Sequence, residues 1–271
     1  MWTPSPVVAA RTPSETPVAD PDDEVLDGCR ALCSAEVLRS GPPTAATGSM
    51  QRRFEGNPTD IGEYVHDQTD DDHTIQVYIA DVHMSNSAGF QEMGPEANAF
   101  NVGLKGMCGC TALFVVNPNG VYYAHYFEDP SFYPRRNFED KVIKFLKATG
   151  GANGFPSLQD RIDIFNNEHT QAFIFTPQKY SGEGSGATGN NKKPQYEPEV
   201  KQLVGALTEI LPLLPNPPTV YIYRAPNSGT SHGQNLMERF SNGRALFQYD
   251  RANDPPYRLY FEDYLQNLQY T

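Results

Sequence analysis

The sequence is poor in the features that define several large protein classes. Only four of its 271 residues are cysteine, too few for a small disulfide-stabilised scaffold. No apolar run approaches the roughly 18 residues of a membrane-spanning helix, so we expect no membrane partner. The first residues, 1–6, have neither the basic nor the apolar segment of a secretory signal. The location therefore stays open between the cytoplasm and secretion as an effector that lacks its signal.

Positive charge is also scarce. The chain has 21 Lys and Arg residues against 33 Asp and Glu, which gives a formal net charge of −12. Such a chain repels the phosphates of nucleic acids on average, so we expect no nucleic-acid partner. Hydrophobic residues make up 38% of the sequence, enough for a core, whereas 23 prolines and 22 glycines indicate a large share of loops.

Composition divides the chain into two regions. Residues 1–60 are rich in Pro, Ser, Thr and Ala, and we predict a mostly flexible arm with one possible helix over 23–38. Residues 61–271 have globular patterning and are predicted to form a single catalytic-type domain. The patterning predicts strands over 74–82, 111–116, 121–127, 171–175, 219–223 and 245–249, helices over 138–146, 158–165 and 200–211, and loops over 85–102 and 181–194. This order favours an α/β or mixed α+β fold, with a central β-sheet or β-sandwich flanked by helices.

The most distinctive local pattern joins Cys110 to His125. The two predicted strands between them are connected by Asn-Pro-Asn-Gly, and Asn-Gly is a strong hairpin signal. A cysteine at the start of one strand and a histidine on its hairpin partner can lie side by side, and such a pair suffices for thiolate chemistry. Gly109 would allow a sharp approach in which nearby backbone N–H groups form an oxyanion hole. The alternative is a buried structural cysteine beside a histidine on an aromatic strand.

The segment Gly106-Met107-Cys108-Gly109-Cys110-Thr111, followed by an apolar strand and a histidine, resembles the catalytic core of the cytotoxic necrotizing factor family of bacterial toxins. That family shares its fold with the chemotaxis deamidase CheD and with Burkholderia lethal factor. Its motif is Leu-Ser-Gly-Cys, so Cys108 stands where the family has serine. The similarity covers about twenty residues, 107–127.

The resemblance implies a fold like that of CheD and hydrolysis of a glutamine side-chain amide in a protein substrate. Cys110 would be the nucleophile and His125 the base, and an amine in place of water would give transglutamination. No cofactor is implied. The departure at Cys108 leaves open a Cys108–Cys110 redox pair and the question of which sulfur reacts, although the spacing to His125 favours Cys110.

The resemblance also implies a third group that orients His125, either a backbone carbonyl or a hydroxyl from a neighbouring strand. The predicted strand 74–82 is the natural donor, and Val77 stands at roughly the family's offset upstream of the cysteine. We therefore expect the Val77 carbonyl to serve. The side chains of Thr111, Tyr78 and Asp81 are alternatives.

Metal binding is a weaker interpretation of the same residue types. The pair Cys29/Cys33 lies on a predicted helix and not on a knuckle turn, and the pair Cys108/Cys110 has only one residue between its cysteines, fewer than zinc knuckles usually have. A second cluster, His66 with residues 70–73, is typical of a solvated loop. We therefore expect no metal site.

Two other functions stay open. The first is a non-enzymatic interaction protein on the same scaffold, which would bind a partner through its Tyr- and Phe-rich face and would keep Cys110 buried or bonded to Cys108. The second is another cysteine hydrolase, such as a peptidase or acyltransferase. Papain-type enzymes place their histidine more than a hundred residues after the cysteine, unlike this chain.

Overall fold

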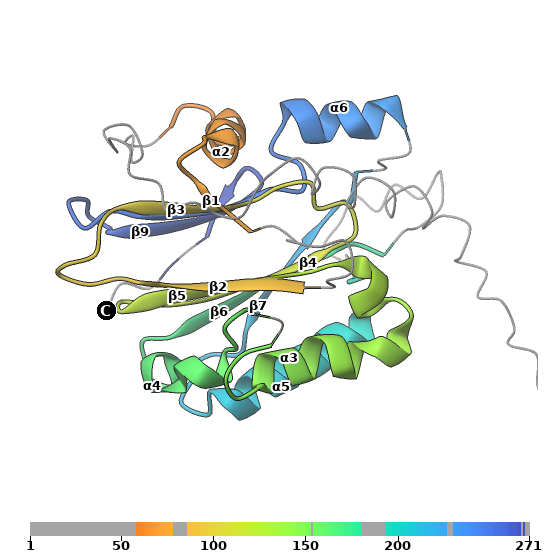
Figure 1. The fold of residues 1–271 in the computed structure, drawn as a ribbon. Coiled ribbons are helices and arrows are strands. Elements are labelled where there is room, and N and C mark those ends of the chain that lie inside the picture. Colours follow the sequence, from red (N-terminus) through yellow and green to blue (C-terminus); the bar gives the residue numbers. More distant parts are fainter. Residues whose placement is uncertain are drawn as a thin grey trace, which may run out of the picture.

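A computed structural model describes residues 58–77, 86–152, 154–179, 193–226, 230–266 and 268. These residues form two five-stranded sheets stacked face to face, with helices over both outer faces (Figure 1). The expected mixed α+β fold, a β-sandwich flanked by helices, is confirmed. The possible helix over 23–38 and most of the predicted arm lie outside the described residues.

Sheet A has the strand order β1-β3-β8-β9-β10, and sheet B has the order β2-β5-β4-β6-β7. Pairing is antiparallel except for β1 with β3 and β6 with β7. The strands of sheet A are β1 (Ile75–Gln76), β3 (Phe100–Leu104), β8 (Ala245–Tyr249), β9 (Tyr257–Phe261) and β10 (Tyr264–Leu265). Those of sheet B are β2 (Asn86–Glu92), β4 (Thr111–Asn117), β5 (Gly120–Tyr126), β6 (Gln171–Pro177) and β7 (Thr219–Tyr223).

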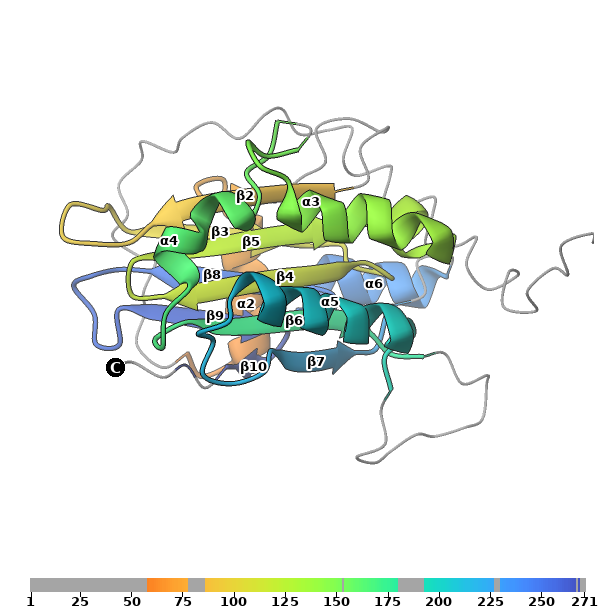
Figure 2. The same ribbon diagram turned by 90° about the horizontal axis from the view of Figure 1, so that it is seen from below.

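The helices are divided between the two outer faces. Helices α2 (Ile61–Asp70) and α6 (Ser231–Arg239) lie on the side of sheet A, and α3 (Lys144–Lys147), α4 (Ile162–Phe165) and α5 (Glu197–Ile210) lie across sheet B (Figures 1 and 2). Short 3₁₀ or π turns complete the connections, at Glu128–Phe132, Arg135–Asn137, Glu139–Ile143 and Gln159–Arg161. The helices expected near 138–146, 158–165 and 200–211 are thus present, with somewhat different bounds.

The predicted hairpin forms the centre of sheet B. The Asn117 side chain accepts hydrogen bonds from the backbone N–H groups of Asn119 and Gly120, which closes the turn between β4 and β5. Every residue of both strands is buried, because one face packs against sheet A and the other against the helices. Burial on both faces explains why these strands read as nearly continuous apolar runs.

The predicted loop over 85–102 is wrong, because this segment contains β2 and the start of β3. Gly89 is required by packing within β2, because a Cβ atom there would lie 2.3 Å from the Tyr123 ring. In β3, a Cβ atom on Gly103 would lie 2.8 Å from Thr74. The expected strand 74–82 is shorter among the described residues, where Ile75–Gln76 pairs with β3.

Candidate functional site

Strand register brings Cys110 and His125 to the same face of sheet B. His125 is opposite Ala112 on the neighbouring β4, and Cys110 lies two residues before Ala112. Cys110 and Ala112 both belong to the core between the two sheets, so this face of the hairpin points toward sheet A. The backbones of such diagonal neighbours on adjacent strands are roughly 7 Å apart, a distance that aromatic and other long side chains can span.

Both residues are covered in this conformation. Cys110 and Cys108 are each 1% exposed and His125 is 5% exposed. The His125 ring packs on Phe127 with 4.6 Å between ring centroids. The two cysteines are present as thiols and are not joined in a disulfide. A cysteine that attacks a glutamine of another protein must be at least partly exposed, and the Cys110 thiol is less accessible than that.

The backbone of Cys110 is fixed from the far side of the sheet. The Tyr223 hydroxyl, at the end of β7, donates a 2.8 Å hydrogen bond to the Cys110 carbonyl oxygen. Tyr223 also packs against Phe175 of β6, with ring centroids 4.4 Å apart. The candidate nucleophile therefore stands at the end of the sandwich where β4 begins and β5, β6 and β7 end.

The expectation that Val77 comes from the strand beside His125 is wrong. Val77 directly follows β1, and its N–H donates to Gly103 of sheet A. The strand that adjoins β5 is β2, which was predicted to be part of a loop. The register of sheet B therefore gives no support to an orienting role for the Val77 carbonyl.

Ser87 occupies the position that Val77 was expected to fill. It is directly opposite His125 in the pairing of β2 with β5, so the two side chains share a face. Ser87 is 2% exposed, and its hydroxyl has no hydrogen-bond partner among the described residues. Because directly opposed Cβ atoms are about 5 Å apart, this hydroxyl can hydrogen-bond the imidazole after a rotamer change.

Among the described residues, the structure brings no other side chain that was proposed to orient His125 into the position of Ser87. The Thr111 hydroxyl hydrogen-bonds the Thr176 hydroxyl of β6 at 3.0 Å, on the opposite side of β4 from β5. Tyr78 and Asp81 lie outside the described residues.

Gly109 is explained by the side chain of Glu128. A Cβ atom at position 109 would lie 2.1 Å from a carboxylate oxygen, Oε2, of Glu128. Gly109 is not among the residues with positive φ, so its glycine is required by space and not by an unusual backbone angle. The sequence led us to expect backbone N–H groups of an oxyanion hole beside Gly109, whereas the space that a Cβ atom would fill holds a carboxylate.

Two side chains hold this carboxylate in place. The Tyr196 hydroxyl donates to Glu128 Oε1 at 2.5 Å, and the Gln195 amide donates to the same oxygen at 3.0 Å. Burial raises the pKa of Tyr196 far above its ordinary value, and the adjacent Glu128 charge acts in the same direction. The hydroxyl therefore stays protonated and acts as a donor.

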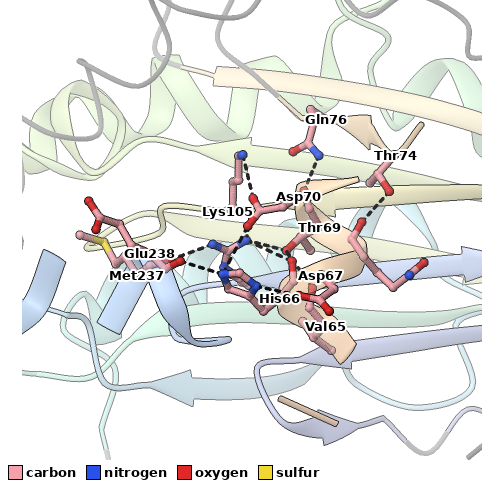
Figure 3. A network of polar contacts seen from close by, with 12 residues as sticks. Val65, His66, Asp67, Thr69, Asp70, Thr74, Gln76, Lys105, Met237 and Glu238 are labelled. Atoms are coloured by element: carbon pink, nitrogen blue, oxygen red, sulfur yellow. Dashed lines mark hydrogen bonds and ion pairs between the residues drawn. The ribbon is translucent and has the colours of Figure 1, made fainter. Parts of the chain in front are cut away.

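The acidic cluster near the start of the described chain forms a structural network. Asp70 makes ion pairs with Lys105 and Arg244 at 2.9 and 3.0 Å, and His66 Nε2 donates to the Glu238 carbonyl at 2.7 Å (Figure 3). Within the part of the chain that the structure describes, no group of three His, Cys, Asp or Glu residues could hold a metal ion. Cys29 and Cys33 lie outside that part.

No helix among the described residues is long and apolar enough to cross a membrane. The chain matches none of the family models, curated proteins or solved structures with which it was compared. The resemblance to the cytotoxic necrotizing factor family therefore rests on the motif at 107–127, and the functional argument rests on the geometry of this site.

Proposed function

We propose that this chain is a cysteine-dependent amidohydrolase that deamidates a glutamine side chain of a protein substrate. The observation that carries the proposal is the register that places Cys110 and His125 on one face of adjacent strands, with Ser87 on the other side of His125. This order of thiol, imidazole and hydroxyl provides a nucleophile, a base and a group that can orient the base.

The chemistry divides into two acyl-transfer steps. His125 takes the proton of Cys110, and the thiolate attacks the carboxamide carbon of glutamine. The tetrahedral intermediate expels ammonia, which leaves with a proton from His125, and a thioester remains on Cys110. Water attacks the thioester with His125 as the base, which releases glutamate and regenerates the thiol. A primary amine in place of water would give transglutamination.

Burial of the thiol sets a condition on this function. A glutamine side chain cannot reach a cysteine that is 1% exposed, so the packing at this end of the sandwich must open before reaction. We therefore expect a small, neutral alkylating reagent to modify Cys110 faster than a bulky one.

Burial of Cys110 is also what a non-enzymatic protein would show, and this observation favours that second candidate. The interaction protein proposed from the sequence, however, would bind its partner through an accessible Tyr- and Phe-rich face. The aromatic residues of the hairpin, Tyr122, Tyr123, Tyr126 and Phe127, are all buried. A binding role would therefore need a different surface.

The test combines native thiol labelling with a direct assay for deamidation. Purified protein is treated with iodoacetamide, and the modified cysteine is identified by tandem mass spectrometry. Ammonia release and the mass gain of glutamate are then followed on glutamine-rich proteins. We expect selective labelling of Cys110 that falls at least tenfold in His125→Ala, and complete loss of activity in Cys110→Ser.

Matched variants separate the roles of the neighbouring groups. Cys108→Ser restores the serine of the family motif and should keep activity if Cys110 is the nucleophile. Ser87→Ala should lower the turnover number while Cys110 stays reactive, because the imidazole loses a group that can orient it. A Cys110 that reacts no faster in the native state than Cys108, and no slower in His125→Ala, would contradict the proposal.

A further inference from the structure

We infer that Glu128 is a positioning residue for Cys110: its carboxylate, seated against Gly109 and held by Tyr196 and Gln195, fixes the turn that carries the thiol and restrains its ionisation. The inference rests on the proposed function of Cys110 as the nucleophile. It adds a group that the motif at 107–127 does not contain, because Glu128 follows the end of β5.

The first argument is the space that the carboxylate occupies. Glu128 Oε2 lies 2.1 Å from the position of a Cβ atom on Gly109. Adjacent Cα atoms are 3.8 Å apart, so this oxygen is within roughly 7 Å of the Cα atoms of both Cys108 and Cys110. The carboxylate therefore lies against Gly109, the middle residue of the short turn between the two cysteines.

The second argument is the way the carboxylate is held. Glu128 is 7% exposed, and both Tyr196 and Gln195 donate to its Oε1. These donors lie on the segment that enters α5, and Tyr196 packs on Phe132 with ring centroids 5.4 Å apart. The turn at Cys108–Cys110 is therefore braced against the helical layer of the molecule. It does not rest on sheet B alone.

The third argument is electrostatic. A carboxylate near a thiol disfavours the thiolate, whereas a protonated imidazole favours it. Glu128 and His125 therefore act on the ionisation of Cys110 in opposite directions. Among the described residues, four other titratable or charged groups lie near the turn besides Cys108. Tyr223 donates to the Cys110 carbonyl, and Tyr196 lies near Arg135. Glu262 accepts a hydrogen bond from the N–H of Gly243, whose carbonyl accepts from the N–H of Met107.

A double-mutant cycle tests the contact independently of any chemistry. Gly109→Ala should lower the midpoint temperature of unfolding in the wild-type protein, because the added methyl group displaces the carboxylate from Tyr196. In a Glu128→Ala background the space is open, so the same change should cost much less. Equal losses in the two backgrounds would overturn the seating of the carboxylate on Gly109.

The pH dependence of alkylation tests the effect on the thiol. The rate constant for iodoacetamide at Cys110 is measured from about pH 6 to pH 10 in wild type, Glu128→Gln and Glu199→Gln. The glutamine keeps the acceptor for Tyr196 and removes the charge. We expect its profile to shift to lower pH, with a rate at neutral pH that is about three- to tenfold higher.

Glu199→Gln is the matched control. Glu199 is another buried glutamate and lies in the first turn of α5, where its carboxylate is paired with Arg135. Its profile should equal that of the wild type. An unshifted profile in Glu128→Gln, or an equal shift in both variants, would overturn the inference.

The two proposals fail in different ways. If the Glu128→Gln profile shifts while His125→Ala has no effect on the rate, Glu128 acts on the thiol and the Cys–His mechanism is wrong. If His125→Ala slows alkylation and the Glu128→Gln profile is unshifted, the mechanism stands and Glu128 has no role in ionisation. If Cys110 is unreactive in every variant, both proposals are overturned.

Discussion

The outer faces of the two sheets are covered in different ways. Over sheet B, the helices α3, α4 and α5 share a large apolar core with the strands, which includes Leu203 and Leu207. Over sheet A, the apolar contact of α2 is a small cluster of Tyr64, Val65, Leu246 and Tyr260. Arg244 joins α2 to α6 by hydrogen bonds, and His66 of α2 contacts Glu238 of α6 (Figure 3).

This difference separates two kinds of stability in one sandwich. Apolar packing is insensitive to salt and to mild acid, whereas ion pairs and charge-assisted hydrogen bonds weaken when a partner titrates. Sheet B, which carries the candidate site, is thus covered by the helices whose packing responds less to salt and pH. We expect substitutions on the two faces to differ in magnitude and in their response to pH.

The largest loss is expected from Leu207→Ala. This side chain is fully buried between α5 and sheet B, so its removal leaves a cavity. The free energy of unfolding should fall by about 2–5 kcal/mol in urea titrations. Leu213, which is 59% exposed just after α5, provides the control, and Leu213→Ala should change it little. Similar losses in the two variants would show that α5 is loosely packed.

A smaller loss is expected from Arg244→Met. The guanidinium is 4% exposed and donates to the carbonyls of Met237 and Phe240 at the end of α6, and to Thr69 in α2. Its removal leaves those acceptors unsatisfied, at a cost of about 1–3 kcal/mol. Hydrogen exchange should quicken in α6 and stay unchanged in α5. Arg239→Met, at an exposed position of α6, should leave exchange unaltered.

The third effect depends on pH. Burial would raise the pKa of Asp70, but hydrogen bonds and charges from Arg244 and Lys105 outweigh it and hold the pKa below the ordinary 3.8. A lowered folded-state pKa stabilises the protein above that ordinary value, and the contribution is lost as pH falls through the folded value. Asp70→Asn should therefore cost less than about 1 kcal/mol near neutral pH, because Asp70 is partly exposed.

Thermal unfolding at neutral pH and at progressively lower pH measures this difference. The gap between wild type and Asp70→Asn should shrink below about pH 4. A gap that stays constant in acid would show that Asp70 acts by shape and not by charge.

The smallest effect is expected at the exposed surface over sheet B. Lys144 pairs with Asp140 one turn earlier, which raises the pKa of Lys144 and lowers that of Asp140, but both side chains are about two-thirds exposed. Such solvated pairs contribute little. Lys144→Ala should leave the midpoint temperature of unfolding unchanged, at low salt and at high salt. A measurable loss at low salt would give this face an electrostatic component after all.

The sequence predicted the hairpin and the mixed fold because their signals are local. Asn-Gly marks the turn, and buried strands and the apolar stripe of α5 appear directly in the residue pattern. The segment that became β2 carries no such signal. Its Asn-Ser-Ala-Gly run reads as a loop, and it forms a strand because Tyr123 fills the space above Gly89 and all seven residues pair with β5.

In the candidate site, too, the sequence predicted what local signals determine and not what depends on distant parts of the chain. That Cys110 and His125 lie on one face was predictable because one hairpin joins them. That Ser87 lies opposite His125 was not, because Ser87 is on a strand that propensity does not indicate. Val77 was chosen by its offset along the chain, which strand pairing does not follow. Glu128, Tyr196 and Gln195 meet through tertiary packing across 67 or 68 residues, which no short motif encodes.

The passage of the chain between the two sheets has a consequence for folding kinetics. It enters sheet A at β1, leaves for β2, returns for β3, builds β4 to β7 in sheet B, and comes back for β8 to β10. Sheet A therefore forms only when distant segments meet, such as Asn101 and Gln248, which hydrogen-bond across 147 residues. Such non-local pairing slows folding, and losing either sheet exposes the inner core of the other. The two sheets are thus expected to unfold in one cooperative transition.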